Sequence, residues 1–298
     1  MPDHWPDMMV AAANGVYLVN RDSQRLLLSG DGMYAGMSWS ETALYVGARR
    51  YQPMDEQRGQ PEQIQAIRSL NPLESTAFDY DGQWSIHQIF CHAGLLYVTA
   101  PARDAIDIID LATGDISVWK WTPEDGHDDH HINSVWSDGK ALWVCHNNFG
   151  DGRPGEILCF SMDRTLLGRL EIGSALHNVF VRDGHIFTCS SQEGRILRHD
   201  IQSGKAIESS LFDGVVQERY LRGMAATEES IFVGLSSINE RSKRCDGDAW
   251  VARLSYDLKV QDVLALRYVG QIGEIRIVGE PDLAHNGIRC PALVGIER

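Results

Sequence analysis

The chain has 298 residues, of which 43% are hydrophobic and 23% charged, a composition that excludes a disordered or collagen-like protein. Its 41 acidic residues outnumber its 27 basic residues and give a net charge of -14. This charge argues against nucleic acid or an anionic membrane surface as the partner, but it is compatible with a small anionic ligand held by a few local cations.

The sequence also lacks the features of a membrane-spanning or secreted protein. No stretch approaches the roughly 18 apolar residues of a membrane span, and the first residues carry acids where a signal peptide carries basic residues. The six cysteines are widely spread without a CxxC pair, which indicates free thiols. We therefore expect a cytoplasmic protein, whose oligomeric state the sequence leaves open.

Three short strands are predicted first in chain order, at residues 8–13, 16–22 and 25–29. Five copies of one pattern follow, each with a short β-type run, a polar turn and a second strand centred on an aromatic residue. The copies begin at Ala35, His87, His131, His177 and Arg222. The aromatic residues are Tyr45, Tyr97, Trp143, Phe187 and Phe232, which we interpret as core between blades. A repeat of about 40–50 residues with several strands per unit is typical of an all-β propeller.

The two ends of the chain complete the predicted ring. Residues 281–290 contain His285-Asn286, which matches His177-Asn178 and indicates an inner strand. Pairing this strand with the N-terminal strands would close a single domain of residues 1–298 with six blades, or five if the ends pair differently. Two polar segments, residues 51–63 and 238–248, are expected to be surface loops.

The first residue of each copy should line the central channel near one mouth, and histidine recurs there. These histidines are His87, His131, His177 and, at the C-terminus, His285. Imidazoles that converge on a rigid ring suit a divalent metal, which we expect to be Zn, Mn, Fe or Ca, and a histidine-lined pocket without metal is the alternative. Neighbouring amides would orient the imidazoles or contact the substrate, namely Gln88, Asn133, Asn178 and Asn286.

The register of the third copy is ambiguous because it is two residues longer, so His130 or Asn133 could face the channel in place of His131. Residues 125–129 before it are interpreted as a solvated acidic loop. In the fifth copy Arg222 replaces histidine. A buried arginine needs an anion, either an acid of the chain such as Glu274 or Asp282, or an anionic substrate that it clamps.

The blade pattern from Gly32 to Arg253 resembles the gluconolactonase and virginiamycin lyase families of propellers. The first resemblance implies a divalent cation held by an acid and asparagines, for which Asn133, Asn178 and Asp282 are candidates, although no first-blade glutamate matches. The second implies a histidine base at the propeller mouth beside a metal, a role that His177 or His285 would fill. Four histidines around the axis also resemble, in outline, the much longer carotenoid oxygenases.

These patterns predict a metal-dependent hydrolase or lyase that acts on a small anionic organic molecule. The metal would polarise a substrate oxygen or activate water, with His177 or His285 as base and Arg222 on the anionic group. The alternative is a non-catalytic propeller that binds a small ligand or a protein partner through its polar loops.

Overall fold

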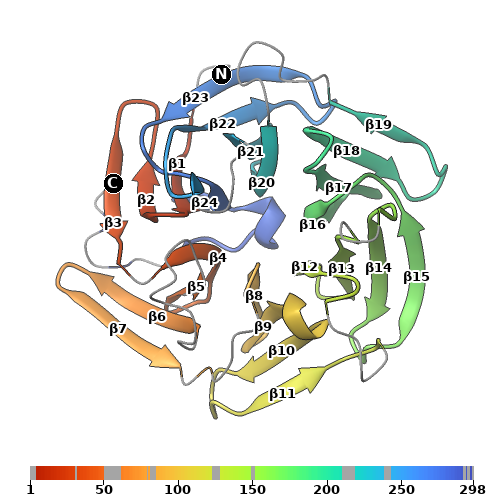
Figure 1. The fold of residues 1–298 in the computed structure, drawn as a ribbon, viewed down its shortest axis with the longest axis horizontal. Helices are drawn as coiled ribbons and strands as arrows, with labels where there is room; N and C mark the ends of the chain where they lie inside the picture. Colours follow the sequence, from red (N-terminus) through yellow and green to blue (C-terminus); the bar gives the residue numbers. More distant parts are fainter. Residues whose placement is uncertain are drawn as a thin grey trace.

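The protein is described by a computed structural model, which covers residues 5–30, 32–49, 62–78, 80, 85–122, 128–148, 152–209, 219–237, 243–290, 293 and 296. Six four-stranded antiparallel sheets surround a central axis like the blades of a propeller (Figure 1). The six-bladed all-β fold predicted from the repeat is therefore confirmed. Within the described ranges, no helix has the length and apolar character needed to cross a membrane.

Blades one to five follow one another along the chain, and each begins with its innermost strand. Blade one contains β4 (Met33–Trp39), β5 (Leu44–Arg49), β6 (Gln63–Leu70) and β7 (Leu73–Phe78). Blade two contains β8 (Ile89–His92), β9 (Leu95–Ala100), β10 (Ala105–Asp110) and β11 (Ile116–Trp119). Blade three contains β12 (Ile132–Ser137), β13 (Ala141–His146), β14 (Glu156–Ser161) and β15 (Leu166–Glu171). Blade four contains β16 (Leu176–Arg182), β17 (His185–Ser190), β18 (Arg195–Asp200) and β19 (Ala206–Glu208). Blade five contains β20 (Arg219–Ala226), β21 (Ile231–Ser237), β22 (Ala249–Leu254) and β23 (Val260–Leu266).

The sixth blade joins the two ends of the chain. Its innermost strand β24 (Ile272–Val278) pairs antiparallel with β1 (Asp7–Ala12), which is followed outward by β2 (Gly15–Val19) and β3 (Gln24–Leu28). The predicted closure of the ring by N-terminal strands and a C-terminal inner strand is thus confirmed. Closure pairs an inner strand that would otherwise expose its hydrogen-bonding edge.

The prediction that residues 281–290 form this inner strand is wrong. The strand is β24, whose apolar run is interrupted by Glu274 and Arg276. Both charged side chains are buried and lie 3.1 Å apart, so they satisfy each other inside the channel and the strand stays internal. Residues 281–290 contain instead a 3₁₀ helix, η5 (Leu283–His285), flanked by Gly279 and Gly287 with left-handed φ values.

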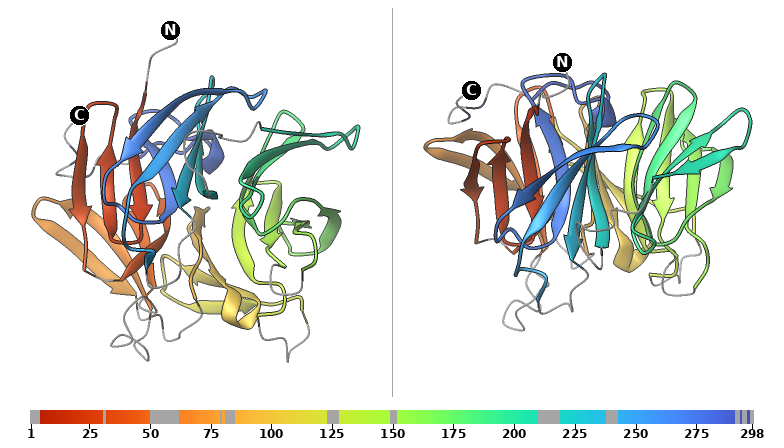
Figure 2. Two further views of the ribbon diagram at one scale, coloured as in Figure 1. Left: turned by 45° about the horizontal axis from the view of Figure 1, so that its top comes forward. Right: turned by 90° about the horizontal axis from the view of Figure 1, so that it is seen from above.

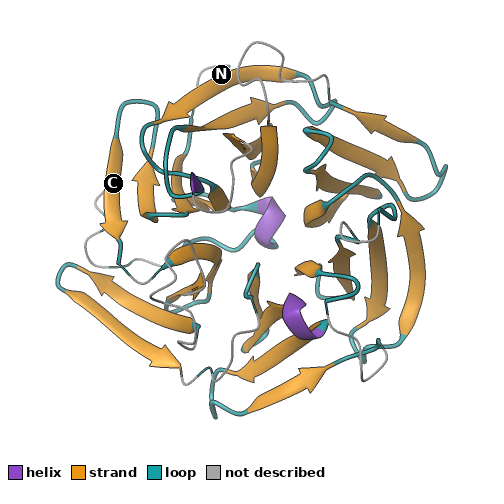
Figure 3. Cartoon of the chain, viewed as in Figure 1, coloured by secondary structure: helices purple, strands orange, loops and turns teal. Residues whose placement is uncertain are grey.

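Helix η5 lies at the centre of the ring, where the channel passes between the blades (Figure 3). The carboxylate of Asp282 caps it and also accepts a hydrogen bond from the backbone N–H of Ala226, the last residue of β20. The ring of His285 accepts a hydrogen bond from the N–H of Trp39, the last residue of β4. Helix η5 therefore closes the channel at the C-terminal ends of the inner strands, and the tilted blades that enclose it are seen from the side in Figure 2.

The aromatic residues of the second strands pack between the blades, as predicted. Four of them are buried, Tyr45, Tyr97, Phe187 and Phe232, and Trp143 packs against the largest apolar cluster. All six cysteines are free thiols, in agreement with the sequence prediction.

Candidate functional site

The pairing of strands identifies the inner-strand residues that are equivalent in the five repeats. The aromatic residues of the second strands pair with Ser38, Phe90, Trp136, Phe180 and Ala225. The residue three positions earlier in each inner strand is then Ala35, His87, Asn133, His177 and Arg222. The third repeat therefore contributes Asn133 to this ring, which is one of the alternatives that the sequence left open. Asn133 lies ten residues before Trp143, the same interval as in the other four repeats, so a start at His131 is two residues too early.

His131 nevertheless reaches the ring from the preceding loop. The buried carboxylate of Asp104 accepts hydrogen bonds from the backbone N–H groups of Asp129, His130 and His131 and fixes that loop. The two Nε2 atoms of His131 and His87 then lie 3.1 Å apart. His130 instead stacks on His146, with ring centroids 4.6 Å apart.

Three imidazoles and an arginine thus meet at the N-terminal ends of the inner strands. The rings of His87 and His177 are nearly parallel, with centroids 6.2 Å apart, and Tyr220 packs edge-on against His177 at 5.3 Å. An Nη2–H of Arg222 donates across the channel to the carbonyl oxygen of His87, at 3.3 Å. Because β8 and β20 are separated by two blades on either side of the ring, this contact spans the channel.

The hydrogen bonds of His177 fix its tautomer. Its Nδ1 atom lies 3.1 Å from the carbonyl oxygen of Ala175, which can only accept, so Nδ1 carries the proton. The hydroxyl of Ser191 donates to the carbonyl of Leu221 and accepts from the same Nδ1 atom at 2.9 Å. The Nε2 atom of His177 is left with a lone pair and has no hydrogen-bond partner among the described residues.

His87 has the same tautomer, but its lone pair is occupied. Its Nδ1–H donates to the carbonyl oxygen of Ser85 at 2.6 Å, so Nε2 is the acceptor. An Nη1–H of Arg49 lies 3.4 Å from that Nε2 atom, and His131 approaches it from the other side. Burial lowers the pKa of both His87 and His177 well below 6.5, and the charge of Arg222 lowers both further. Both rings are therefore neutral at physiological pH, and only His177 has a lone pair without a described partner.

No carboxylate in the described part of the chain forms a hydrogen bond or ion pair with the guanidinium of Arg222. Glu274 pairs with Arg276, and Asp282 accepts backbone N–H groups around η5, so neither acid bonds the guanidinium. The ion pair considered from the sequence is therefore not formed. Burial lowers the pKa of Arg222 to about 10, and the charges of Arg49 and Arg244 act in the same direction.

His285, predicted as both a metal ligand and a base, lies at the other end of the channel. Its Nε2 atom is 3.0 Å from the hydroxyl of Ser38, its ring packs edge-on against Phe90, and it is fully buried. The structure does not bring it to His87 and His177. Asn286 beside it caps the end of η5 in a left-handed conformation, far from the ring of imidazoles.

The other predicted amides make structural contacts. Asn133 donates to the carbonyl of Leu176, while Gln88 and Asn178 both donate to the carboxylate of Glu274. The sequence reasoning missed Arg49 and Ser191, which lie at the ends of second strands. The strand pattern could have identified both residues, because the C-terminal end of a second strand lies beside the N-terminal end of the inner strand with which it pairs.

The imidazoles do not form a complete metal site among the described residues. The ranges that the structure covers contain no group of three or more histidine, cysteine or acidic side chains that could hold a metal ion. The guanidinium of Arg49 also contacts the Nε2 atom of His87 that a cation would share with His131. The N–H groups of Arg49 and Arg222 suit an anion better than a cation. The divalent metal therefore stays a prediction. The loops predicted at residues 51–61, 125–127 and 238–242 lie outside the described residues.

Comparison with known proteins supports the fold and leaves the chemistry open. No known family profile matches the chain, and no curated protein is similar to it in sequence. Its fold is similar to that of a chain in a nidogen/laminin complex, with a TM-score of 0.66, 12% identity, and coverage of 92% of this chain and 98% of the other. A protein of unknown function from Bacteroides caccae gives a TM-score of 0.66 at 9% identity, over 91% of this chain and 98% of the other. Virginiamycin B lyase from Staphylococcus aureus gives 0.52 at 13% identity, over 80% and 85%.

Proposed function

We propose that the histidine-arginine mouth binds a small anionic organic molecule and acts on it as a hydrolase or lyase. The observation that carries this proposal is Arg222, a buried guanidinium that donates one N–H to the His87 carbonyl and has no described partner for the other four. A planar guanidinium bonds a carboxylate or phosphate through two parallel N–H groups, so an anionic ligand would satisfy both its charge and its donors.

His177 is the base in this proposal. Its Nδ1–H is held by Ala175 and Ser191, which directs the Nε2 lone pair away from these partners. The lowered pKa keeps this atom unprotonated at neutral pH. It would take a proton either from an attacking water molecule, in hydrolysis, or from a carbon of the substrate, in elimination. Elemental analysis of the purified protein would test directly for the predicted divalent metal.

Substitution of Arg222 by glutamine tests the anion site. We expect the dissociation constants for acetate and inorganic phosphate to rise about ten- to a hundredfold, because a charge-assisted hydrogen bond contributes about 1.5–3 kcal/mol. The control is Arg198→Gln, which removes a surface arginine that pairs with Asp257 and should leave both constants unchanged. Unchanged anion binding in R222Q would contradict the proposal.

Substitution of His177 by glutamine separates binding from catalysis. A panel of small anionic esters, lactones and hydroxy acids, followed by mass spectrometry, identifies a substrate for the wild-type protein. We expect H177Q to bind acetate within about threefold of the wild type while turnover falls at least about a hundredfold. Binding without turnover of any compound by the wild type would support the non-catalytic ligand-binding propeller instead.

A further inference from the structure

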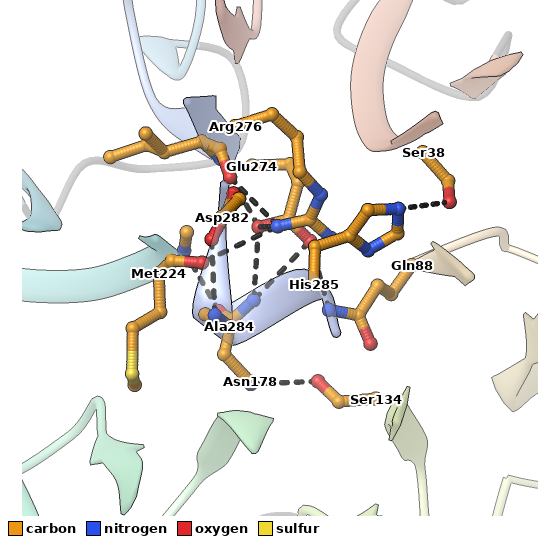
Figure 4. Close-up of polar contacts among 12 residues, drawn as sticks. Ser38, Gln88, Ser134, Asn178, Met224, Glu274, Arg276, Asp282, Ala284 and His285 are labelled. Atoms are coloured by element: carbon orange, nitrogen blue, oxygen red, sulfur yellow. Dashed lines mark hydrogen bonds and ion pairs between the residues drawn. The ribbon is translucent and has the colours of Figure 1, made fainter. Parts of the chain in front are cut away.

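A buried carboxylate lies at the centre of the channel, one layer below the imidazoles. Glu274 of β24 is fully buried and accepts hydrogen bonds from four donors (Figure 4). These are Gln88 Nε2 at 2.8 Å, Asn178 Nδ2 at 3.1 Å, Arg276 Nη1 at 3.1 Å and the backbone N–H of Ile275 at 3.1 Å. Both oxygen atoms of the carboxyl group thus act as acceptors.

The two amides that donate to Glu274 cannot rotate to present their oxygen atoms instead. The Oε1 atom of Gln88 accepts from the backbone N–H of Val135 at 2.8 Å. The Oδ1 atom of Asn178 accepts from the backbone N–H of Gly223, also at 2.8 Å. A flip of either amide would leave a buried backbone N–H without an acceptor, so the amide nitrogen atoms must face Glu274.

Each of the three site residues immediately precedes a member of this network. His87 precedes Gln88, His177 precedes Asn178, and Arg222 precedes Gly223 in the sequence. The chain of contacts from Glu274 therefore joins the starts of β8, β16 and β20, which are strands of three different blades. Consecutive Cα atoms are only 3.8 Å apart, so a displacement of the network moves the neighbouring site residue with it.

We propose that Glu274 is a positioning residue, which holds His87, His177 and Arg222 in the arrangement that binds the anion. It makes no hydrogen bond to any of the three side chains. Its hydrogen bonds hold Gln88 and Asn178, and Asn178 in turn holds Gly223, while its negative charge acts directly on Arg222. This inference rests on the proposed function for its readout, because anion binding is the property that the arrangement would create.

The variant Glu274→Gln tests this role. The new side chain has one amide oxygen and one amide nitrogen. Its nitrogen atom would face the amide nitrogen of Gln88 or of Asn178, and neither of these two amides can rotate to accept from it. We expect the dissociation constant for inorganic phosphate to rise about tenfold or more, which corresponds to about 1.4 kcal/mol. The imidazole NMR signals of His87 and His177 should shift as well. The matched control is Asp107→Asn, which removes a buried carboxylate that pairs with Arg103 and accepts from Tyr80 in blade two, away from the channel. It should leave binding and both signals unchanged.

A second variant rescues the network if the proposal is correct. In E274Q/Q88E the carboxylate moves to position 88, where one oxygen atom accepts from the backbone N–H of Val135 and the other accepts from the new amide nitrogen, while the new amide oxygen still accepts from Asn178, Arg276 and the N–H of Ile275. We expect phosphate binding to recover to within about threefold of the wild type.

The outcomes distinguish this inference from the proposed function. If the wild type binds neither phosphate nor acetate, the proposed function fails. If R222Q loses binding while folded E274Q binds like the wild type with unmoved histidine signals, the proposed function stands and the positioning role of Glu274 is wrong. Failure of the double variant to recover binding, with a circular dichroism spectrum like that of the wild type, would also overturn the positioning role.

Discussion

The chemistry of the site follows from which nitrogen atom of each imidazole carries a proton. His87 and His177 both donate Nδ1–H to a backbone carbonyl, yet only His87 has its Nε2 atom contacted by a guanidinium. This difference assigns the base to His177. No sequence pattern contains it, because the carbonyls of Ser85 and Ala175 are backbone groups and the distinguishing Arg49 is distant in the chain.

At the same scale, Arg222→Gln should raise the pKa of His177 and His87. The arginine charge disfavours protonation of both rings, so its removal brings their pKa values closer to 6.5. NMR titration of the imidazole signals of His87 and His177 checks this. A fall in either pKa, or no change, would mean that the guanidinium does not act on the rings.

At the scale of the element, the inner strands approach one another more closely than side chains allow. A Cβ atom at Gly273 would lie 2.6 Å from the carbonyl oxygen of Tyr34, and one at Gly36 would lie 2.7 Å from the backbone nitrogen of Ile89. These glycines make one side of the ring narrow. These contacts join blade six to blade one and blade one to blade two.

Gly234→Ala tests the consequence of this close packing. Its Cβ atom would lie 2.2 Å from the carbonyl oxygen of Arg222, so we expect a loss of about 1–3 kcal/mol in the free energy of unfolding. Urea unfolding measures it. Gly168→Ala in β15 is the control, because nothing lies within 4 Å of the added atom. Equal stability of the two variants would show that β20 and β24 can move away from Gly234, which lies in the second strand β21, without cost.

For the whole molecule, three fully buried imidazoles make stability depend on pH. Burial lowers the pKa of His87, His177 and His285 well below the unfolded value of 6.5, so the unfolded chain binds more protons as the pH falls. Stability is complete above pH 6.5 and declines below it, by up to roughly 1.4 kcal/mol per pH unit for each histidine. Asp282, whose pKa burial raises to about 6, opposes this decline between about pH 6 and 4, but it is one group against three.

Urea unfolding at pH 7.5 and pH 5.5 checks this dependence, and the midpoint should be lower at pH 5.5. His285→Gln should reduce the dependence by the contribution of one histidine, because it leaves His87 and His177 in place. A midpoint that does not change with pH would show that these rings bind protons equally in the folded and unfolded states.

The number of blades could be predicted because the aromatic residues of the second strands recur at a regular interval. Contacts between residues distant in the chain do not alter that interval. The closing strand could not be predicted, because charged residues such as Glu274 and Arg276 are typical of an exposed strand. Only the structure shows that Gln88 and Asn178 donate to Glu274 inside the channel. The histidines could be predicted as a group for the same reason as the aromatic residues. The separation of His285 from the others required the position of η5.

Closure of the ring by both ends of the chain also dictates an order of events during synthesis. The strands β1 to β3 leave the ribosome first, but their inner neighbour β24 is made last. At roughly 5–20 residues per second, β1 waits about 15 seconds to one minute for its partner. During that interval the apolar strand β1 has an unpaired edge, so the nascent protein is most exposed to aggregation and to chaperones at its N-terminus.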